Sequence, residues 1–148
     1  MASPVRFYVD ADTLGLAHVL VTIRGDVTYP GDPGGQFKRL VRPACPVTRT
    51  RTPDEEWLPI VAQQGWLVIT RDQNLRNKTV EMDSILRHGA KVVTIVNARR
   101  SKGLERPKLD VFRQLQILLR HWENVEELFD LPGPFIYDVS QTGMHKIA

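Results

Sequence analysis

The chain has 148 residues, of which 42% are hydrophobic and 25% charged, with a net charge of +3 at pH 7. This balance excludes a disordered chain and predicts a single domain, 1–148, with its own hydrophobic core. The lone cysteine, Cys45, excludes an intramolecular disulfide and indicates a reducing, cytoplasmic setting. No apolar run approaches the roughly 20 residues that a membrane span needs, and the first predicted strand leaves no room for a signal peptide, so we expect no membrane association.

Strand and helix patterns alternate from the start of the chain. Residues 5–9 form an apolar run typical of a buried strand, and residues 13–23 follow as a helix with Asp12 as its expected N-cap. A short strand is expected at 26–29. Residues 30–52 hold four prolines and three glycines, which predict an irregular loop. Loops of this length inside a small domain are uncommon and often functional.

The alternation continues to the C-terminus. Thr52, Pro53 and Glu55 give the sequence signature of a helix start, and this helix should run to about Gln64. Further predicted elements are a strand at 66–70, a helix at 77–88 ended by Gly89, a strand at 91–96, a basic loop at 97–107, a long helix at 108–129 with Phe112 and Leu119 on its apolar stripe, and an edge strand at 135–139. The order predicts an α/β fold of three layers, with a mainly parallel sheet flanked by helices.

Acidic residues stand where these elements meet. Asp10 closes the first strand, Asp72 follows the strand at 66–70, and Asp54 opens the helix between them. Strand ends and helix starts of an α/β fold share one edge of the sheet, where ligands usually bind. Carboxylates gathered there repel one another unless a cation holds them, and hard divalent cations prefer oxygen ligands. The pattern predicts a metal site, for which phosphoryl chemistry is a common use.

Each acid also has a structural alternative. Asp10 suits a turn or a cap, and Asp12 is placed as a cap itself. Acids in a first helical turn are favoured by the helix dipole by roughly 0.3–1 kcal/mol. Helical phase distinguishes Asp54, which shares a stripe with apolar residues, from Glu56, which points away. Glu81, in the helix at 77–88, fits either a solvated helix face or a supporting role at the site.

Basic residues near this edge suggest contacts to a phosphate backbone. The candidates are Arg71, Arg76, Lys78, Arg99 and Arg100. Their alternative is ordinary surface charge, which is common in soluble proteins. The four histidines are scattered without spacing suited to zinc, and no glycine-rich phosphate loop is present.

Three segments together resemble PIN-like domain ribonucleases, a group that includes toxins of bacterial toxin–antitoxin pairs. They are Asp10-Ala-Asp-Thr-Leu-Gly, Asp54-Glu-Glu-Trp and Gly65-Trp-Leu-Val-Ile-Thr-Arg-Asp72, and the resemblance covers roughly residues 5–97. It implies a parallel sheet flanked by helices that cuts RNA at a Mg²⁺ or Mn²⁺ site. It also implies RNA as substrate, an antitoxin protein as partner and a homodimer as a common assembly.

The resemblance implies a role for each acid in turn. Asp10, Asp54 and Asp72 would hold the metal, with Glu81 and Asp12 completing the cluster. One departure matters, because Asn97 stands where classical members carry a further acid after the fourth strand. The choice between one and two metal ions therefore stays open, as do the RNA target and the cleavage position.

Two other functions compete with this interpretation. Asp10-Ala-Asp-Thr approaches the start of haloacid-dehalogenase-type phosphatases, in which the first aspartate is a nucleophile and the second an acid or base. That match ends at Leu14, and no paired-aspartate motif follows a late strand. The third possibility is a PIN-like module that binds RNA or protein without cutting.

Overall fold

The computed structural model describes residues 4–71, 79–97 and 109–148, without the side chains of 79–81. The strands of its main sheet are β1 (Phe7–Val9), β2 (Val27–Thr28), β5 (Leu67–Thr70), β6 (Lys91–Ile95), β7 (Phe135–Val139) and β8 (Met144–Lys146). Their order across the sheet is β2-β1-β5-β6-β7-β8. All neighbours pair parallel except β7 and β8, which are antiparallel.

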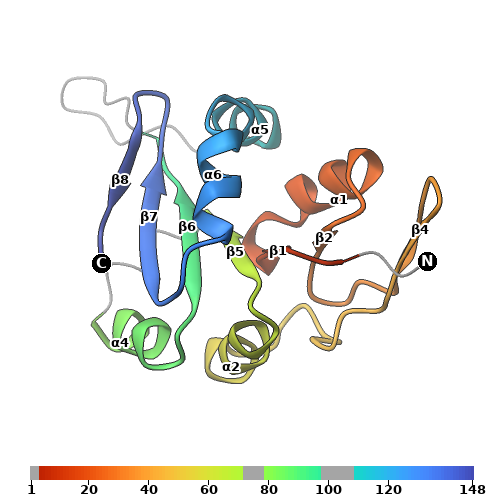
Figure 1. Ribbon diagram of the computed structural model, residues 1–148, viewed down its shortest axis with the longest axis horizontal. Helices are drawn as coiled ribbons and strands as arrows, with labels where there is room; N and C mark the ends of the chain where they lie inside the picture. The colour runs from red at the N-terminus through yellow and green to blue at the C-terminus, as the bar shows by residue number, and fades with distance from the viewer. Residues whose placement is uncertain (1–3, 72–78, 98–108) are drawn as a thin grey trace.

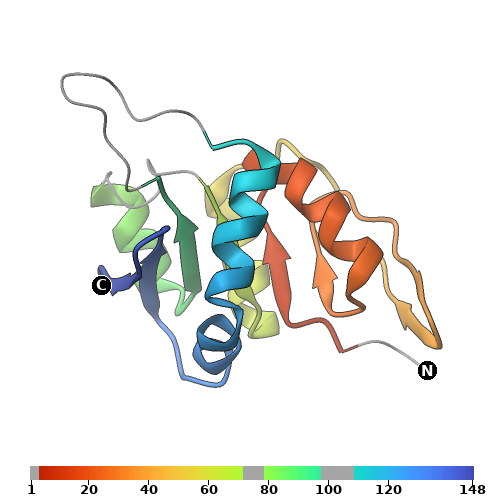
Figure 2. The same ribbon diagram turned by 90° about the horizontal axis from the view of Figure 1, so that it is seen from above.

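Helices cover both faces of this sheet, so the predicted three-layer α/β architecture is confirmed (Figures 1 and 2). The described helices are α1 (Leu14–Ile23), α2 (Asp54–Gln64), α4 (Thr79–Arg87), α5 (Val111–Arg120) and α6 (Trp122–Phe129). Helices α1, α5 and α6 lie on one face, and α2 and α4 lie on the other. Residues of α1, α5 and α6 belong to one hydrophobic cluster, and residues of α2 and α4 belong to the other.

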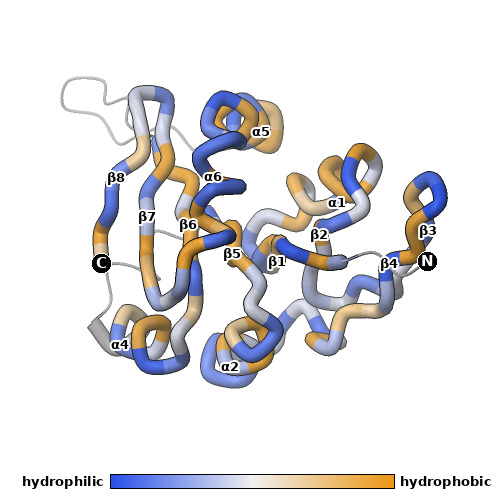
Figure 3. The backbone as a smooth tube through the Cα atoms, in the orientation of Figure 1, coloured by the Kyte–Doolittle hydropathy of each residue, from blue (hydrophilic) through white to orange (hydrophobic). Residues whose placement is uncertain are grey.

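Alternation along the strands divides the core into two clusters. Phe7 and Val9 pack with α1, α5 and α6, whereas Tyr8 between them packs with α2. Because successive side chains of a strand point to opposite faces, one short apolar run serves both layers. Figure 3 shows the hydrophobic residues gathered on the central strands.

The turn after β1 differs from its prediction. A short 3₁₀ helix, η1 (Ala11–Thr13), precedes α1, and Asp10 is its N-cap because the Asp10 carboxylate accepts from the Ala11 backbone N–H. Asp12 lies inside this helix, so its prediction as the cap of α1 is wrong. The tight turn brings both carboxylates to the edge of the sheet within two residues.

The C-terminal part of the chain also corrects the prediction. Instead of one helix over 108–129, the described residues form α5 and α6, separated at His121, whose ring nitrogen contacts the Ser140 carbonyl at 2.9 Å. The change of direction lets Trp122 pack on Phe7 with ring centroids 4.9 Å apart. Phe112 and Leu119, predicted as part of a buried stripe, are 69% and 56% exposed.

Three smaller differences concern the strands and the start of α2. β7 is not an edge strand, because it pairs with β6 on one side and with β8 on the other. The proline-rich loop contains a hairpin, β3 (Gly35–Phe37) and β4 (Leu40–Arg42), that composition did not predict. Thr52 does not cap α2; its hydroxyl donates to the Arg49 carbonyl instead.

Candidate functional site at the carboxyl edge of the sheet

The register of the parallel strands places a row of polar side chains at one edge. The Asp10 backbone N–H donates to the Ile69 carbonyl at 2.9 Å, which continues the pairing of β1 with β5. Thr70 pairs with Thr94, and Thr94 pairs with Asp138. Four polar side chains therefore belong to the face covered by α2 and α4, and all are buried: Asp10, Thr70, Thr94 and Asp138. A buried polar row at the carboxyl end of a parallel sheet is typical of a functional site.

Asp10 and Asp12 share one hydroxyl group. The Thr70 Oγ1 lies 3.2 Å from Asp10 Oδ2, 3.2 Å from Asp12 Oδ1 and 3.3 Å from Asp12 Oδ2. A hydroxyl carries one proton, so Thr70 donates to one carboxylate at a time. The two carboxylates are therefore close neighbours whose negative charges a single hydroxyl does not compensate.

This environment changes the acidity of Asp10. Burial, followed by the negative charge of Asp12, raises the pKa of Asp10 to about 7, and the charge of Asp54 adds to the increase. Hydrogen bonds from the Ala11 backbone N–H, at 2.7 Å, and from Thr70 act in the opposite direction but do not outweigh it. At neutral pH the cation-free Asp10 is therefore only partly ionised.

Asp54 approaches the pair from α2. It is the first residue of that helix and accepts a hydrogen bond of 2.9 Å from Trp57 Nε1. Trp57 is buried against the sheet, whereas Glu56 is exposed, so the predicted helical phase is confirmed. Burial, together with the charges of Asp10 and Asp54, also raises the pKa of the fully buried Tyr8. The charge of Asp54 thus acts at the same edge as that of Asp10.

Arg71 and Gln114 connect the turn that carries Asp12 to the start of α5 by hydrogen bonds. The Arg71 guanidinium donates from Nη2 to the Asp12 carbonyl at 2.8 Å and from Nη1 to the Leu109 carbonyl at 3.2 Å. Gln114, 2% exposed, accepts from the Thr13 hydroxyl and donates to the Leu109 carbonyl at 2.9 Å. The same residues line a cleft between η1 and the start of α5. Arg71 therefore holds the turn that carries Asp12, and its predicted contact to phosphate stays a prediction.

Several predicted site residues lie outside the described part of the chain. They are Asp72, Arg76, Lys78, Arg99, Arg100 and the side chain of Glu81, so their roles stay predictions. Asn97 is buried and accepts a hydrogen bond of 2.9 Å from Gln141.

Sequence reasoning missed four members of this edge: Thr70, Thr94, Gln114 and Asp138. The period of two along the strands at 66–70, 91–96 and 135–139 was a signal for the first, second and last of these. Nothing in the sequence indicates Gln114, because its partners come from a turn about 100 residues earlier.

The donor set at Asp10 and Asp12 fits a hard divalent cation. Within the described ranges, no group of three or more His, Cys, Asp or Glu side chains is arranged to hold a metal ion. Asp10 nevertheless combines burial, a neighbouring carboxylate and a raised pKa, and none of the ion pairs between described residues includes it. A cation bound to both carboxylates would remove their repulsion with the oxygen ligands that Mg²⁺ and Mn²⁺ prefer.

Comparison with known proteins agrees with this architecture. A model of the family described as "PIN like domain" matches residues 6–97, which run from the residue before β1 to the second residue after β6. The chain therefore belongs to the PIN-like domain family. The match includes Asp10, Asp12 and Asp54, which is the part of the chain that builds the acidic edge.

One curated relative extends the comparison. The chain is 27% identical over 97 residues to a Mycobacterium tuberculosis protein named "Putative ribonuclease VapC45". The alignment covers 64% of this chain and 62% of that relative, so the chain spans less than two thirds of the relative's length. No solved structure showed a significant match. None of the described helices has the length and apolar character needed to cross a membrane.

Proposed function

We propose that this protein is a metal-dependent endoribonuclease that hydrolyses RNA phosphodiester bonds at the carboxyl edge of its sheet. The observation that carries the proposal is the buried Asp10, which shares the Thr70 hydroxyl with the partly buried Asp12 and whose pKa is raised by the charges of both Asp12 and Asp54. Family membership and the ribonuclease name of the relative support the same reaction class. The phosphatase alternative has no comparable support, because the match over Asp10 and Asp12 is to the PIN-like family.

The proposed ligands of a Mg²⁺ or Mn²⁺ ion are Asp10, Asp54 and Asp72, with Asp12 and Glu81 completing the set. When bound, such an ion supplies an activated water and neutralises charge on the scissile phosphate. The protein's own residues prepare this chemistry. The β1–β5 pairing holds the backbone of Asp10, and the hydrogen bond from Arg71 holds the backbone of Asp12. Both carboxylates are therefore positioned before substrate arrives.

Ordering of the turn lowers the cost of assembling the site. The η1 backbone is fixed at one end by Asp10, which caps it, and at the other by Thr13, which bonds Gln114 of α5. The Thr70 hydroxyl lies 3.2 Å from one oxygen of each carboxylate and donates to one of them at a time. Carboxylates held by such contacts need little rearrangement on cation binding, which is the general advantage of preorganised sites.

PIN-like domain ribonucleases include toxins of toxin–antitoxin pairs, and family membership leads us to extend that role to this chain. As a toxin it would act on cellular RNA in the cytoplasm and be inhibited by a cognate antitoxin. Expression in a bacterial host should then arrest growth, whereas the Asp10→Asn variant should not. Co-expression of a small neighbouring gene should restore growth if that gene encodes the antitoxin. Arrest by the Asp10→Asn variant would contradict the toxin role.

Cleavage of a labelled single-stranded RNA tests the reaction itself. The wild-type protein should cut with Mg²⁺ or Mn²⁺ and stop with EDTA, and Asp10→Asn, Asp54→Asn and Asp72→Asn should each lower the rate by about a thousandfold or more. Glu56→Gln is the matched control, because Glu56 lies in the first turn of the same helix as Asp54 but is exposed to solvent. Full activity in Asp10→Asn, or activity unaffected by EDTA, would overturn the proposal.

A further inference from the structure

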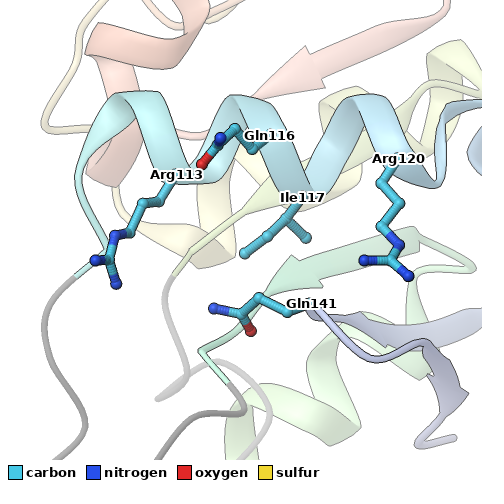
Figure 4. Close-up of a pocket in the computed structure, with 5 residues that line it drawn as sticks. All are labelled: Arg113, Gln116, Ile117, Arg120 and Gln141. Carbon is cyan, nitrogen blue, oxygen red and sulfur yellow. The ribbon is translucent and has the colours of Figure 1, made fainter.

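A second polar groove lies on the other side of α5 from the cleft at Asp12. It runs between α5 and the turn after β7, and Figure 4 shows the residues that line it: Arg113, Gln116, Ile117, Arg120 and Gln141. The two guanidinium groups stand at opposite ends of the groove, and the Gln141 amide faces Ile117 between them. This set combines two positive charges, two amides and an apolar floor.

The two arginines differ from the arginines that form ion pairs. Arg6, Arg24 and Arg42 each form an ion pair with an aspartate. Neither Arg113 nor Arg120 appears in any ion pair between described residues, and both side chains are exposed. Their positive charge is therefore directed to solvent, where an anion can reach it.

Their spacing suits an extended polyanion. Arg113 and Arg120 are seven residues apart on α5, which is about 10 Å of helix and almost two full turns, so both lie on one side of the helix. A single small anion does not span this length. A polymer that carries a negative charge on every unit does, and an arginine fork matches a phosphate in two hydrogen bonds.

The groove is connected to the acidic edge through two contacts. Gln141 donates to Asn97, which follows β6 at the carboxyl edge of the sheet. At the other side Gln114, the residue after Arg113, holds the Thr13 hydroxyl in the turn that carries Asp12. Hydrogen bonds thus tie both elements beside the groove, α5 and the turn after β7, to segments that meet at the acidic edge.

We propose that this groove, formed by Arg113, Gln116, Ile117, Arg120 and Gln141, binds the phosphate backbone of single-stranded RNA beside the scissile bond. The proposal rests on the ribonuclease function above and assigns the substrate's path on one side of the site. An acidic protein segment is the other polyanion that arginines attract. The amides favour RNA, since they match the hydroxyl groups and base edges that a single strand presents between its phosphates.

The test measures RNA binding without cleavage. A short fluorescein-labelled single-stranded RNA of mixed sequence is titrated in EDTA at several salt concentrations, against wild type and the double variant Arg113→Gln/Arg120→Gln. Affinity should fall about tenfold, and the slope of log K against log salt should become shallower by about 0.7 for each lost phosphate contact. Arg39→Gln is the matched control, because Arg39 is an exposed arginine in the β3–β4 turn. The lysine pair Arg113→Lys/Arg120→Lys should keep the slope while losing part of the affinity.

Three outcomes would overturn the proposal. The first is an unchanged RNA affinity of the double variant, and the second is an equal loss of RNA affinity in Arg39→Gln. The third is that the double variant binds poly-glutamate more weakly than wild type does but binds RNA equally well. Thermal melting of each variant checks that the fold is kept. A misfolded double variant would leave the single variants to be tested, each with an expected slope change of about 0.7. Failure of the ribonuclease function is separate, because it appears as absent metal-dependent cleavage by wild type whatever the RNA affinity.

Discussion

Two regions of this protein bury aspartates in opposite ways. Asp32, 2% exposed, lies in the proline-rich loop and receives two hydrogen bonds from Arg42, at 2.6 and 3.0 Å. Asp10, 7% exposed, lies at the sheet edge, where burial and the negative charge of Asp12 raise its pKa. The loop thus carries its own counter-charge, whereas the edge gathers charges of one sign.

Asp26 shows that the first arrangement is the ordinary one in this chain. Burial alone would raise the pKa of Asp26, but hydrogen bonds from Arg24 and Arg6 outweigh it and hold that pKa below its ordinary value. A buried charge without a partner is costly, so folds usually supply one. None of the ion pairs between described residues includes Asp10, which agrees with the cation site proposed above.

The largest effect on folding is expected from breaking the loop pair. Arg42→Ala leaves the Asp32 carboxylate buried without its counter-charge, which typically costs about 3–5 kcal/mol. Urea unfolding of wild type and Arg42→Ala measures this loss, and the double variant Arg42→Ala/Asp32→Ala should recover part of it. An Arg42→Ala stability within about 1 kcal/mol of wild type would contradict the structural role given to this pair.

At the sheet edge, by contrast, replacing a buried aspartate is expected to stabilise the folded protein. In the folded protein the pKa of Asp10 is about 7, above its ordinary value of 3.8, so the folded state binds this proton more tightly than the unfolded chain. Stability therefore falls as pH rises from about 4 to about 7, by up to roughly 4 kcal/mol. Metal-free Asp10→Asn lacks this loss and should become more stable than wild type by an amount that grows over that range.

Thermal melting in EDTA across this pH range measures the difference, with Asp32→Asn as the comparison. Asp32→Asn should be less stable than wild type, because it weakens a pair that the fold needs. Equal destabilisation by Asp10→Asn and Asp32→Asn would show that both acids are structural, and the distinction between the two regions would be lost.

Cation binding should then act on one region and not the other. A ligand that binds only the folded state stabilises it by about 2.7 kcal/mol at a concentration one hundred times its Kd. Mg²⁺ or Mn²⁺ should raise the Tm of wild type and of Glu56→Gln, and should leave the Tm of Asp10→Asn nearly unchanged. A similar rise in Asp10→Asn would place the cation elsewhere.

The sequence predicted the edge better than it predicted the loop. Asp10 and Asp54 could be placed because strand ends and helix starts follow from local patterns, and helical phase separated Asp54 from Glu56 correctly. The pair of Asp32 and Arg42 could not be predicted, since it depends on a hairpin turn that composition describes only as irregular.

Long-range polar contacts explain the remaining errors. Gln114 lies outside the predicted apolar stripe of Phe112 and Leu119, and its burial is explained only by its hydrogen bond with Thr13. The break at His121 likewise depends on Trp122 packing against Phe7, more than 100 residues away in the chain. Periodicity within one segment contains no information about such partners, so a single continuous helix was the local expectation.

The smallest effect is expected at the margin of the Asp26 cluster. Arg6 bonds Asp26 at 2.7 Å and Glu126 at 3.2 Å, and the Glu126 side chain is 38% exposed. Exposed ion pairs contribute about 0–1 kcal/mol because water screens them and long side chains lose freedom. Glu126→Gln should therefore change the free energy of unfolding by less than about 1 kcal/mol, and the change should shrink further in high salt. Asp26→Asn, measured in the same urea titration, should cost clearly more, because Arg6 and Arg24 would both lose a charged partner at a buried site. Equal losses in the two variants would mean that burial does not distinguish structural acids from surface acids in this protein. Asp26 could then no longer serve as the example of a buried, ion-paired aspartate with which Asp10 is compared.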